Sequence, residues 1–174
     1  MPAKPDDKLH IDYPDDQTIR MTRVFDAPAE LVFRAWTEPK YVRRWWICDT
    51  AGMRMTTCDI DLTVGGRWHW ITEMPQGAFG FFGHYREIEP GQRLVYSENF
   101  QADPSVEPAW DGPTEASIVH LTLREQDGQT VMVSSARYES KALRDYVLST
   151  GMEQGAGQAL DRLAAIIADE AVAA

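Results

Sequence analysis

The sequence contains few cysteines. Only Cys48 and Cys58 occur among 174 residues, which excludes a small secreted scaffold held together by several disulfides. We expect two reduced thiols, as in a cytoplasmic protein, and a single disulfide between them is the alternative.

Basic residues are also scarce. Lysine and arginine number 17 against 27 aspartates and glutamates, and the formal net charge is -10. Nucleic acids and anionic membranes bind basic surfaces, so we expect neither as a partner. No run approaches the ~20 apolar residues of a membrane-spanning helix. The N-terminus lacks a signal-peptide pattern, and we therefore expect a cytoplasmic protein without a membrane span.

The common signatures of catalysis and metal binding are missing. The sequence has no Gly-x-Ser-x-Gly, His-Glu-x-x-His or Cys-x-x-Cys. His69, His84 and His120 lie on three separate strand-like segments without metal-ligand spacing, so we expect no metal and no cofactor. His69 and Glu73 share one strand face and form a candidate acid–base pair. Two solvated side chains explain that spacing equally, and we assign no catalytic residue.

The chain length favours one domain, which we place at residues 18–172. Residues 1–17 contain two lysines, five aspartates and several prolines, a composition typical of a mobile arm. The alternation of Leu9, Ile11 and Tyr13 leaves a short edge strand as the alternative.

Residues 23–46 predict the end of a strand followed by two short helices. Asp26 is placed to cap the first helix by accepting from the free N–H groups of its first turn. Pro28 suits that turn because its missing N–H would have had no partner. A second helix starts at Pro39 and leads into Trp45 and Trp46.

Short segments of strand character, separated by turn residues, occupy most of the chain. They are residues 18–25, 53–58, 67–73, 79–89, 93–100, 117–125 and 130–138. Asp127-Gly128 predicts a hairpin between the last two. Residues 101–115 predict a surface loop, whose Trp110 either anchors it to the body or lies at a cavity mouth.

A long helix is predicted from Gly151 onward. Its apolar positions include Met152, Leu160, Leu163 and Ile167, all on one face. Residues 155–157 read Gly-Ala-Gly, which we interpret as close helix packing. The fold class is therefore α+β: a curved antiparallel sheet of six or seven strands wrapped on the C-terminal helix. Such a sheet and helix rarely fill the space between them, so we expect an internal cavity.

Several motifs, in order, resemble one known family. They are Arg23-x-Phe-Asp-Ala-Pro-x-x-x-Val-Phe-x-Ala-Trp-Thr-x-Pro, Arg44-Trp45-Trp46, Asp61-Leu62-x-Val-Gly-Gly-Arg-Trp, Gly83-x-Tyr-Arg-Glu-Ile-x-Pro, Arg93-Leu94-Val95-Tyr96 and Gly151-Met152-x-x-Gly155. From about residue 18 to residue 167 the chain resembles the activator of Hsp90 ATPase homologue (AHSA1-like) family, of the START-like or Bet v 1-like superfamily. The resemblance implies a helix-grip fold. That superfamily binds lipids, steroids and polyketides, includes some cyclases, and contains an Hsp90 co-chaperone domain.

Aromatic residues form the most informative group. Trp68 and Trp70 alternate onto one strand face, and further rings fall in phase on neighbouring strands. These rings either fill the core or line a pocket for an apolar ligand. The candidate ligand-binding residues are Trp36, Trp45, Trp46, Trp68, Trp70, Phe81, Tyr85, Tyr96 and Met152.

Three arginines are candidate polar groups at the wall of the cavity: Arg23, Arg67 and Arg137. Arg23 has an alternative role, pairing with a carboxylate such as Asp61.

Three functions compete. The first is a non-enzymatic protein that binds a small hydrophobic or aromatic molecule. The second is an interaction module for a chaperone or a homodimer, with an exposed apolar patch around Trp45, Trp46 and Trp110. The third is a cyclase- or hydrolase-like enzyme that uses His69, Glu73 or His84 inside the cavity.

Overall fold

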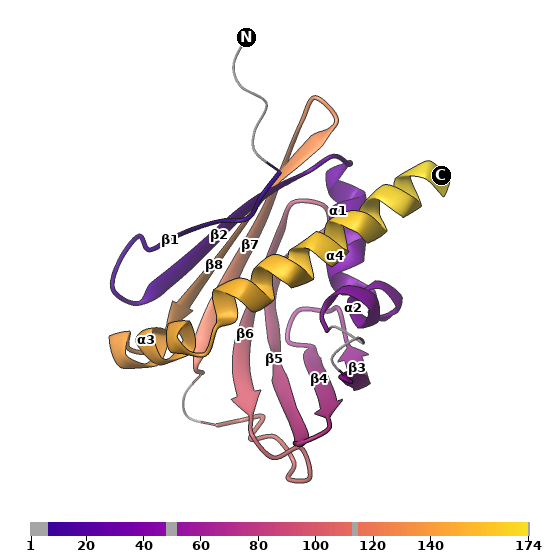
Figure 1. Ribbon diagram of the computed structural model, residues 1–174. Helices are drawn as coiled ribbons and strands as arrows, with labels where there is room; N and C mark the ends of the chain where they lie inside the picture. Colours follow the sequence, from indigo (N-terminus) through magenta and orange to yellow (C-terminus); the bar gives the residue numbers. More distant parts are fainter. Residues whose placement is uncertain (1–6, 48–51, 113–114, 174) are drawn as a thin grey trace.

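An eight-stranded antiparallel sheet carries one long helix across its inner face (Figure 1). The computed structural model describes residues 7–47, 52–112 and 115–173. The strand order is β1-β2-β8-β7-β6-β5-β4-β3. The strands are β1 (His10–Asp12), β2 (Thr18–Phe25), β3 (Arg54–Ile60), β4 (Arg67–Met74), β5 (Gly77–Glu89), β6 (Arg93–Gln101), β7 (Ser117–Gln126) and β8 (Gln129–Tyr138). The α+β prediction is confirmed, with β1 as the additional strand.

The four helices are α1 (Ala29–Thr37), α2 (Pro39–Trp45), α3 (Lys141–Ser149) and α4 (Met152–Ala173). α4 packs on α1 and α2, which cover one end of the inner face. In the described part of the chain, no helix is long and apolar enough to span a membrane.

The N-terminus of α1 differs from the prediction. Pro28 is the N-cap, and no side chain of α1's own N-terminal segment caps the helix. The Ala29 N–H instead donates to Glu125 Oε2 at 2.8 Å, from β7. Asp26 accepts a hydrogen bond from Gln129 Nε2. The predicted Asp26 cap is therefore wrong, because a carboxylate from a distant strand reaches the helix end.

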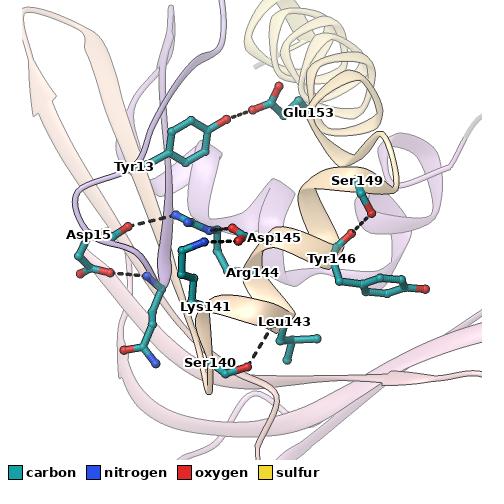
Figure 2. A network of polar contacts seen from close by, with 11 residues as sticks. Tyr13, Asp15, Ser140, Lys141, Leu143, Arg144, Asp145, Tyr146, Ser149 and Glu153 are labelled. Atoms are coloured by element: carbon teal, nitrogen blue, oxygen red, sulfur yellow. Dashed lines mark hydrogen bonds and ion pairs between the residues drawn. The ribbon is translucent and has the colours of Figure 1, made fainter.

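Tyr13 and Asp15, before β2, contact α3 and α4 (Figure 2). His10–Asp12 pair with β2 as an edge strand. Arg144 donates to the Asp15 carbonyl oxygen at 3.1 Å, and Tyr13 donates to Glu153 at the start of α4. Ser140 caps α3 by accepting from the Leu143 N–H.

Helix α4 is packed unevenly along its length. Its inner face is buried from Ala159 onward, including Leu163, which is fully buried. Met152 and Ala156 lie on the same stripe but are only half-buried. A methyl group added at Gly155 or Gly157 would meet nothing within 4 Å. The predicted close packing of these glycines is therefore wrong, since no neighbouring group packs against either position.

Candidate functional site

The inner face of the sheet is lined by aromatic rings from β4, β5 and β6. Trp68 and Trp70 both point inward, because residues two apart on a strand share a face. Their ring centroids lie 4.9 Å apart, and Trp68 meets Tyr96 at 5.7 Å. Tyr96 is paired with Tyr85 across β5 and β6. The sheet therefore brings these four predicted residues together.

One end of this inner face is closed by α1, α2 and the C-terminal half of α4, and we call it the closed end. Trp36 and Trp45 pack there at 4.9 Å between centroids. Trp45 is 1% exposed, and its Nε1 donates to the Ala35 carbonyl at 2.9 Å. Arg162 of α4 donates to the Trp45 carbonyl, which fastens the helix to α2. These rings form a packed core.

The opposite end, at the C-terminal part of β6 and the start of β5, projects past α4 (Figure 1), and we call it the open end. Phe81 and Phe100 are cross-strand partners with centroids 5.4 Å apart. Phe100 is 58% exposed, while Phe79 and Phe81 are half-buried. The aromatic surface therefore continues from the core to solvent.

Trp46 lies between the two ends. It is half-buried, and its ring meets Trp70 at 4.7 Å and Phe81 at 5.7 Å. It also contacts Trp45 at 5.8 Å. A single side chain of α2's C-cap thus covers the aromatic surface of β4 and β5.

The two tryptophans of β4 differ in their hydrogen bonds. Trp68 Nε1 donates to the Ser97 carbonyl at 3.1 Å. Trp70 Nε1 is fully buried and has no partner within the described part of the chain. A buried donor without a partner costs about 1–3 kcal/mol. Trp70 is therefore an unsatisfied polar group in the middle of an apolar surface.

Glu98 is the functional candidate that the sequence analysis missed. It follows Leu94 and Tyr96 in phase on β6, so its side chain lies on the inner face. Burial raises the pKa of its carboxyl to about 7. The signal was present in the sequence: a carboxylate at a strand position that alternates with inward-facing apolar residues.

The predicted arginines are placed differently from one another. Arg23 lies on the inner face and pairs with Asp161 of α4 at 2.6 Å, so the suggested Asp61 partner is wrong. Arg137 is exposed and donates to Asp15. Arg67 is exposed on the outer face, which excludes it from a cavity wall.

A pocket of about 370 Å³ at the sheet edge is lined by Asp7, Lys8, Leu9, Arg23, Gly157 and Asp161.

The candidate catalytic residues lie on the outer face, away from α4. His69 bonds Gln101 at 2.7 Å, and Glu73 pairs with Arg54. His84 shares this outer face, because it is the cross-strand partner of Arg67. The acid–base hypothesis for these three side chains is therefore wrong, since they do not reach the inner face.

Trp110 anchors the loop after β6 on that outer face. Its ring meets Phe82 at 5.3 Å and His69 at 5.6 Å, and the Arg67 guanidinium lies 4.7 Å above it. Of the two roles considered for Trp110, the structure shows the anchor.

Cys58 is a buried, free thiol whose pKa is raised to about 11, chiefly by desolvation. Cys48 lies outside the described residues, so the disulfide alternative is untested. Among the residues described, no cluster of three or more histidine, cysteine or acidic side chains is arranged to hold a metal.

Solved structures with the same fold come from several bacteria. A Rhodobacter sphaeroides protein has a TM-score of 0.79 at 23% identity, covering 93% of this chain and 99% of its own. Protein Ms6760 from Mycobacterium smegmatis has a TM-score of 0.77 at 24% identity, with coverages of 91% and 96%. The AHSA1-like protein from Aeromonas hydrophila has a TM-score of 0.61 at 20% identity, with coverages of 87% and 94%. At these identities the likeness shows the fold.

No curated protein matches the chain. The family model described as "Activator of Hsp90 ATPase homolog 1-like protein" matches residues 26–168, which include α1, α2, most of the sheet and most of α4. The sheet order, the two short helices and the long C-terminal helix agree with that match. The chain therefore belongs to the AHSA1-like family.

Proposed function

We propose that this protein binds a small hydrophobic or aromatic molecule on the inner face of its sheet, at the open end. The unpartnered Nε1 of Trp70 carries the proposal. A ligand with a hydrogen-bond acceptor would satisfy this donor, and its apolar body would pack on Phe81 and Phe100. The binding free energy gained from this one hydrogen bond is large, because the free protein holds the Trp70 N–H desolvated without compensation.

Trp46 acts in this proposal as the gate. Its indole covers Trp70, yet it stays half-buried and comes from the last turn of a short helix. Rotating this one side chain outward would uncover the Trp70 N–H without moving the sheet. Trp68, Tyr85 and Tyr96 would then form the floor of the site.

The first turns of α4 support the same location. Met152 and Ala156 point along the inner stripe but remain half-buried. Water therefore reaches the inner side of α4 there, whereas Leu160 and Leu163 are buried. A ligand that entered at the open end would lie beneath these two side chains.

The interaction-module alternative needs an exposed apolar patch. Trp45 is 1% exposed, and Trp110 packs against Phe82 on the outer face. Two of the three rings expected in that patch are thus engaged in packing. The observations favour ligand binding over a chaperone or homodimer contact through these rings.

The test measures the binding of a neutral probe, 2-naphthylmethanol, by isothermal calorimetry and by thermal shift. Ala156→Phe should block binding by filling the space beneath α4. Gln158→Phe is the control, because it adds the same ring to an exposed position of that helix. Gly83→Phe is unsuitable, since even a Cβ at Gly83 would lie 1.9 Å from the Ser97 carbonyl oxygen.

Saturable binding that Ala156→Phe abolishes and Gln158→Phe preserves is the expected result. Equal binding by both variants would place the ligand elsewhere and contradict the proposed site. No binding of the probe to the wild-type protein would contradict the proposed function.

A further inference from the structure

Glu98 is a carboxylate inside an otherwise apolar and aromatic surface. Along β6, Leu94 and Tyr96 precede it on the inner face and Phe100 follows it. Leu94 and Tyr96 are buried, Glu98 is half-buried and Phe100 is exposed. Glu98 therefore stands at the boundary between the packed core and the open end, where solvent or a ligand reaches it.

The neighbours of Glu98 across the sheet are known from the register. Glu98 is opposite Ser117 of β7, and Ser117 is opposite Tyr138 of β8. Directly opposed residues of antiparallel strands point to the same face. Tyr96 precedes Glu98 by two residues on the same face of β6, and Tyr138 lies beyond Ser117 in the same cross-strand row. Two tyrosines thus flank the carboxyl.

Within the described ranges, the Glu98 carboxyl has neither a hydrogen bond nor an ion pair. The Ser117 hydroxyl bonds the Glu98 carbonyl oxygen, not the side chain. A desolvated carboxylate without a counterion costs stability, so the free protein holds an uncompensated acidic group at the mouth of its proposed site.

We propose that the ligand of this site carries a protonated amine, held by the Glu98 carboxylate between the rings of Tyr96 and Tyr138. This inference rests on the proposed function and names the class of ligand. A cation near two aromatic faces is attracted by their quadrupoles, and a carboxylate adds a charge-assisted hydrogen bond. The net charge of -10 draws organic cations toward the protein and repels carboxylates.

The polar and apolar parts of the ligand then have separate places. The ammonium group lies at Glu98 on β6, and the apolar body lies over Phe81 and Phe100 toward Trp46 and Trp70. Phe100 lies two residues after Glu98 on the same face of β6. Phe81 is the cross-strand partner of Phe100 on β5. An aromatic ring that carries an amine on a short linker matches this arrangement of a carboxylate beside two phenylalanine rings.

The experiment compares 2-naphthylmethylamine with 2-naphthylmethanol by isothermal calorimetry at pH 8, where the carboxyl is mostly ionised and the amine protonated. The wild-type protein should bind the amine about tenfold more tightly than the alcohol. In Glu98→Gln this advantage should fall below about twofold, with alcohol binding retained. Glu98→Asp, which keeps the charge on a shorter side chain, should retain part of the preference for the amine.

Glu139→Gln is the matched control. It removes one negative charge from an exposed position next to Tyr138 and should leave the amine advantage at about tenfold. Circular dichroism of each variant checks that the fold persists.

Two outcomes overturn the inference: equal binding of amine and alcohol to the wild type, or an undiminished amine advantage in Glu98→Gln. If the alcohol binds without any amine advantage, the proposed function stands and the amine assignment fails. If neither probe binds, both fail.

Discussion

The closed end and the open end of the inner face are built from the same kinds of residue but are packed differently. At the closed end, Trp45 is 1% exposed and its N–H has a partner. Toward the open end, Phe100 is 58% exposed, and among the described residues the Trp70 N–H has no partner and Glu98 no counterion. The closed end holds the fold together, and the open end leaves polar groups unsatisfied.

Within this one sheet, the closed end contributes stability and the open end carries the proposed binding site. A protein under selection for stability alone would satisfy or remove Trp70 Nε1 and the Glu98 carboxyl, because each lowers the free energy of unfolding. Truncating a ring at the closed end should therefore cost much stability, whereas removing an unsatisfied polar group at the open end should cost little or stabilise the protein. Four predictions test this, from the largest effect to the smallest.

Truncation should be costly at the closed end and mild at the open end. Trp45→Ala should lower the free energy of unfolding by about 3–5 kcal/mol, since it empties a buried ring site and leaves the Ala35 carbonyl unpaired. Phe100→Ala should cost less than about 1 kcal/mol, because most of its surface is already in water. Urea denaturation measures both. Equal losses would show that the open end is as tightly packed as the closed end.

Removing the Glu98 charge should stabilise the protein at high pH. Burial holds the pKa of this carboxyl at about 7 in the folded state, above its ordinary value of about 4.5. Between those values the unfolded chain releases a proton that the folded chain keeps, so stability falls as pH rises through this window. Glu98→Gln should raise the free energy of unfolding by about 3 kcal/mol at pH 8 and by nothing at pH 4.

Tyr96 and Tyr138 face Glu98, and their pKa values are raised, so both stay neutral across this range. Glu139→Gln, which removes a charge from an exposed position, serves as the control. A Glu98→Gln effect that is the same at pH 4 and pH 8 would contradict an uncompensated carboxyl.

The two tryptophans of β4 form a matched pair. Trp68→Phe and Trp70→Phe remove the same volume, but only the first breaks a hydrogen bond, to the Ser97 carbonyl. Trp68→Phe should therefore be more destabilising than Trp70→Phe by about 1–3 kcal/mol. Chemical denaturation of both variants gives the difference directly. Equal values would mean that Trp70 Nε1 has a partner in solution.

The glycines of α4 give the smallest effect. Gly155→Ala and Gly157→Ala should each stabilise the protein by about 0.5–1 kcal/mol, since alanine favours the helix and its methyl group meets nothing. Thermal unfolding of each variant measures the gain. A loss of stability would indicate that α4 approaches its neighbours more closely in solution than in the structure.

The strands and helices could be predicted because their signals are local. Asp127-Gly128 predicted the β7–β8 hairpin, where both residues adopt positive φ. Pro39 predicted the start of α2, which it occupies. Alternation placed Trp68 and Trp70 on one face. Each of these inferences needed only residues within a few positions of each other.

The failures involve partners that are distant in sequence. Glu125 replaces Asp26 at the start of α1, and Asp161 replaces Asp61 beside Arg23. Neither contact could be deduced without the strand order that brings β7 and α4 to those positions. Glu98 escaped notice for a different reason: a charged residue in a strand is usually solvated, although its phase with Leu94 and Tyr96 already indicated the inner face.

The indole N–H signals of the six tryptophans test the central claim most directly. In a ¹⁵N-labelled sample titrated with 2-naphthylmethylamine, the signals of Trp46 and Trp70 should shift progressively, with those of Trp45 and Trp110 nearly unchanged. This result would place the ligand on the inner face at the open end. Shifts confined to Trp110, on the outer face, or no shift of Trp70 at saturating probe, would contradict it.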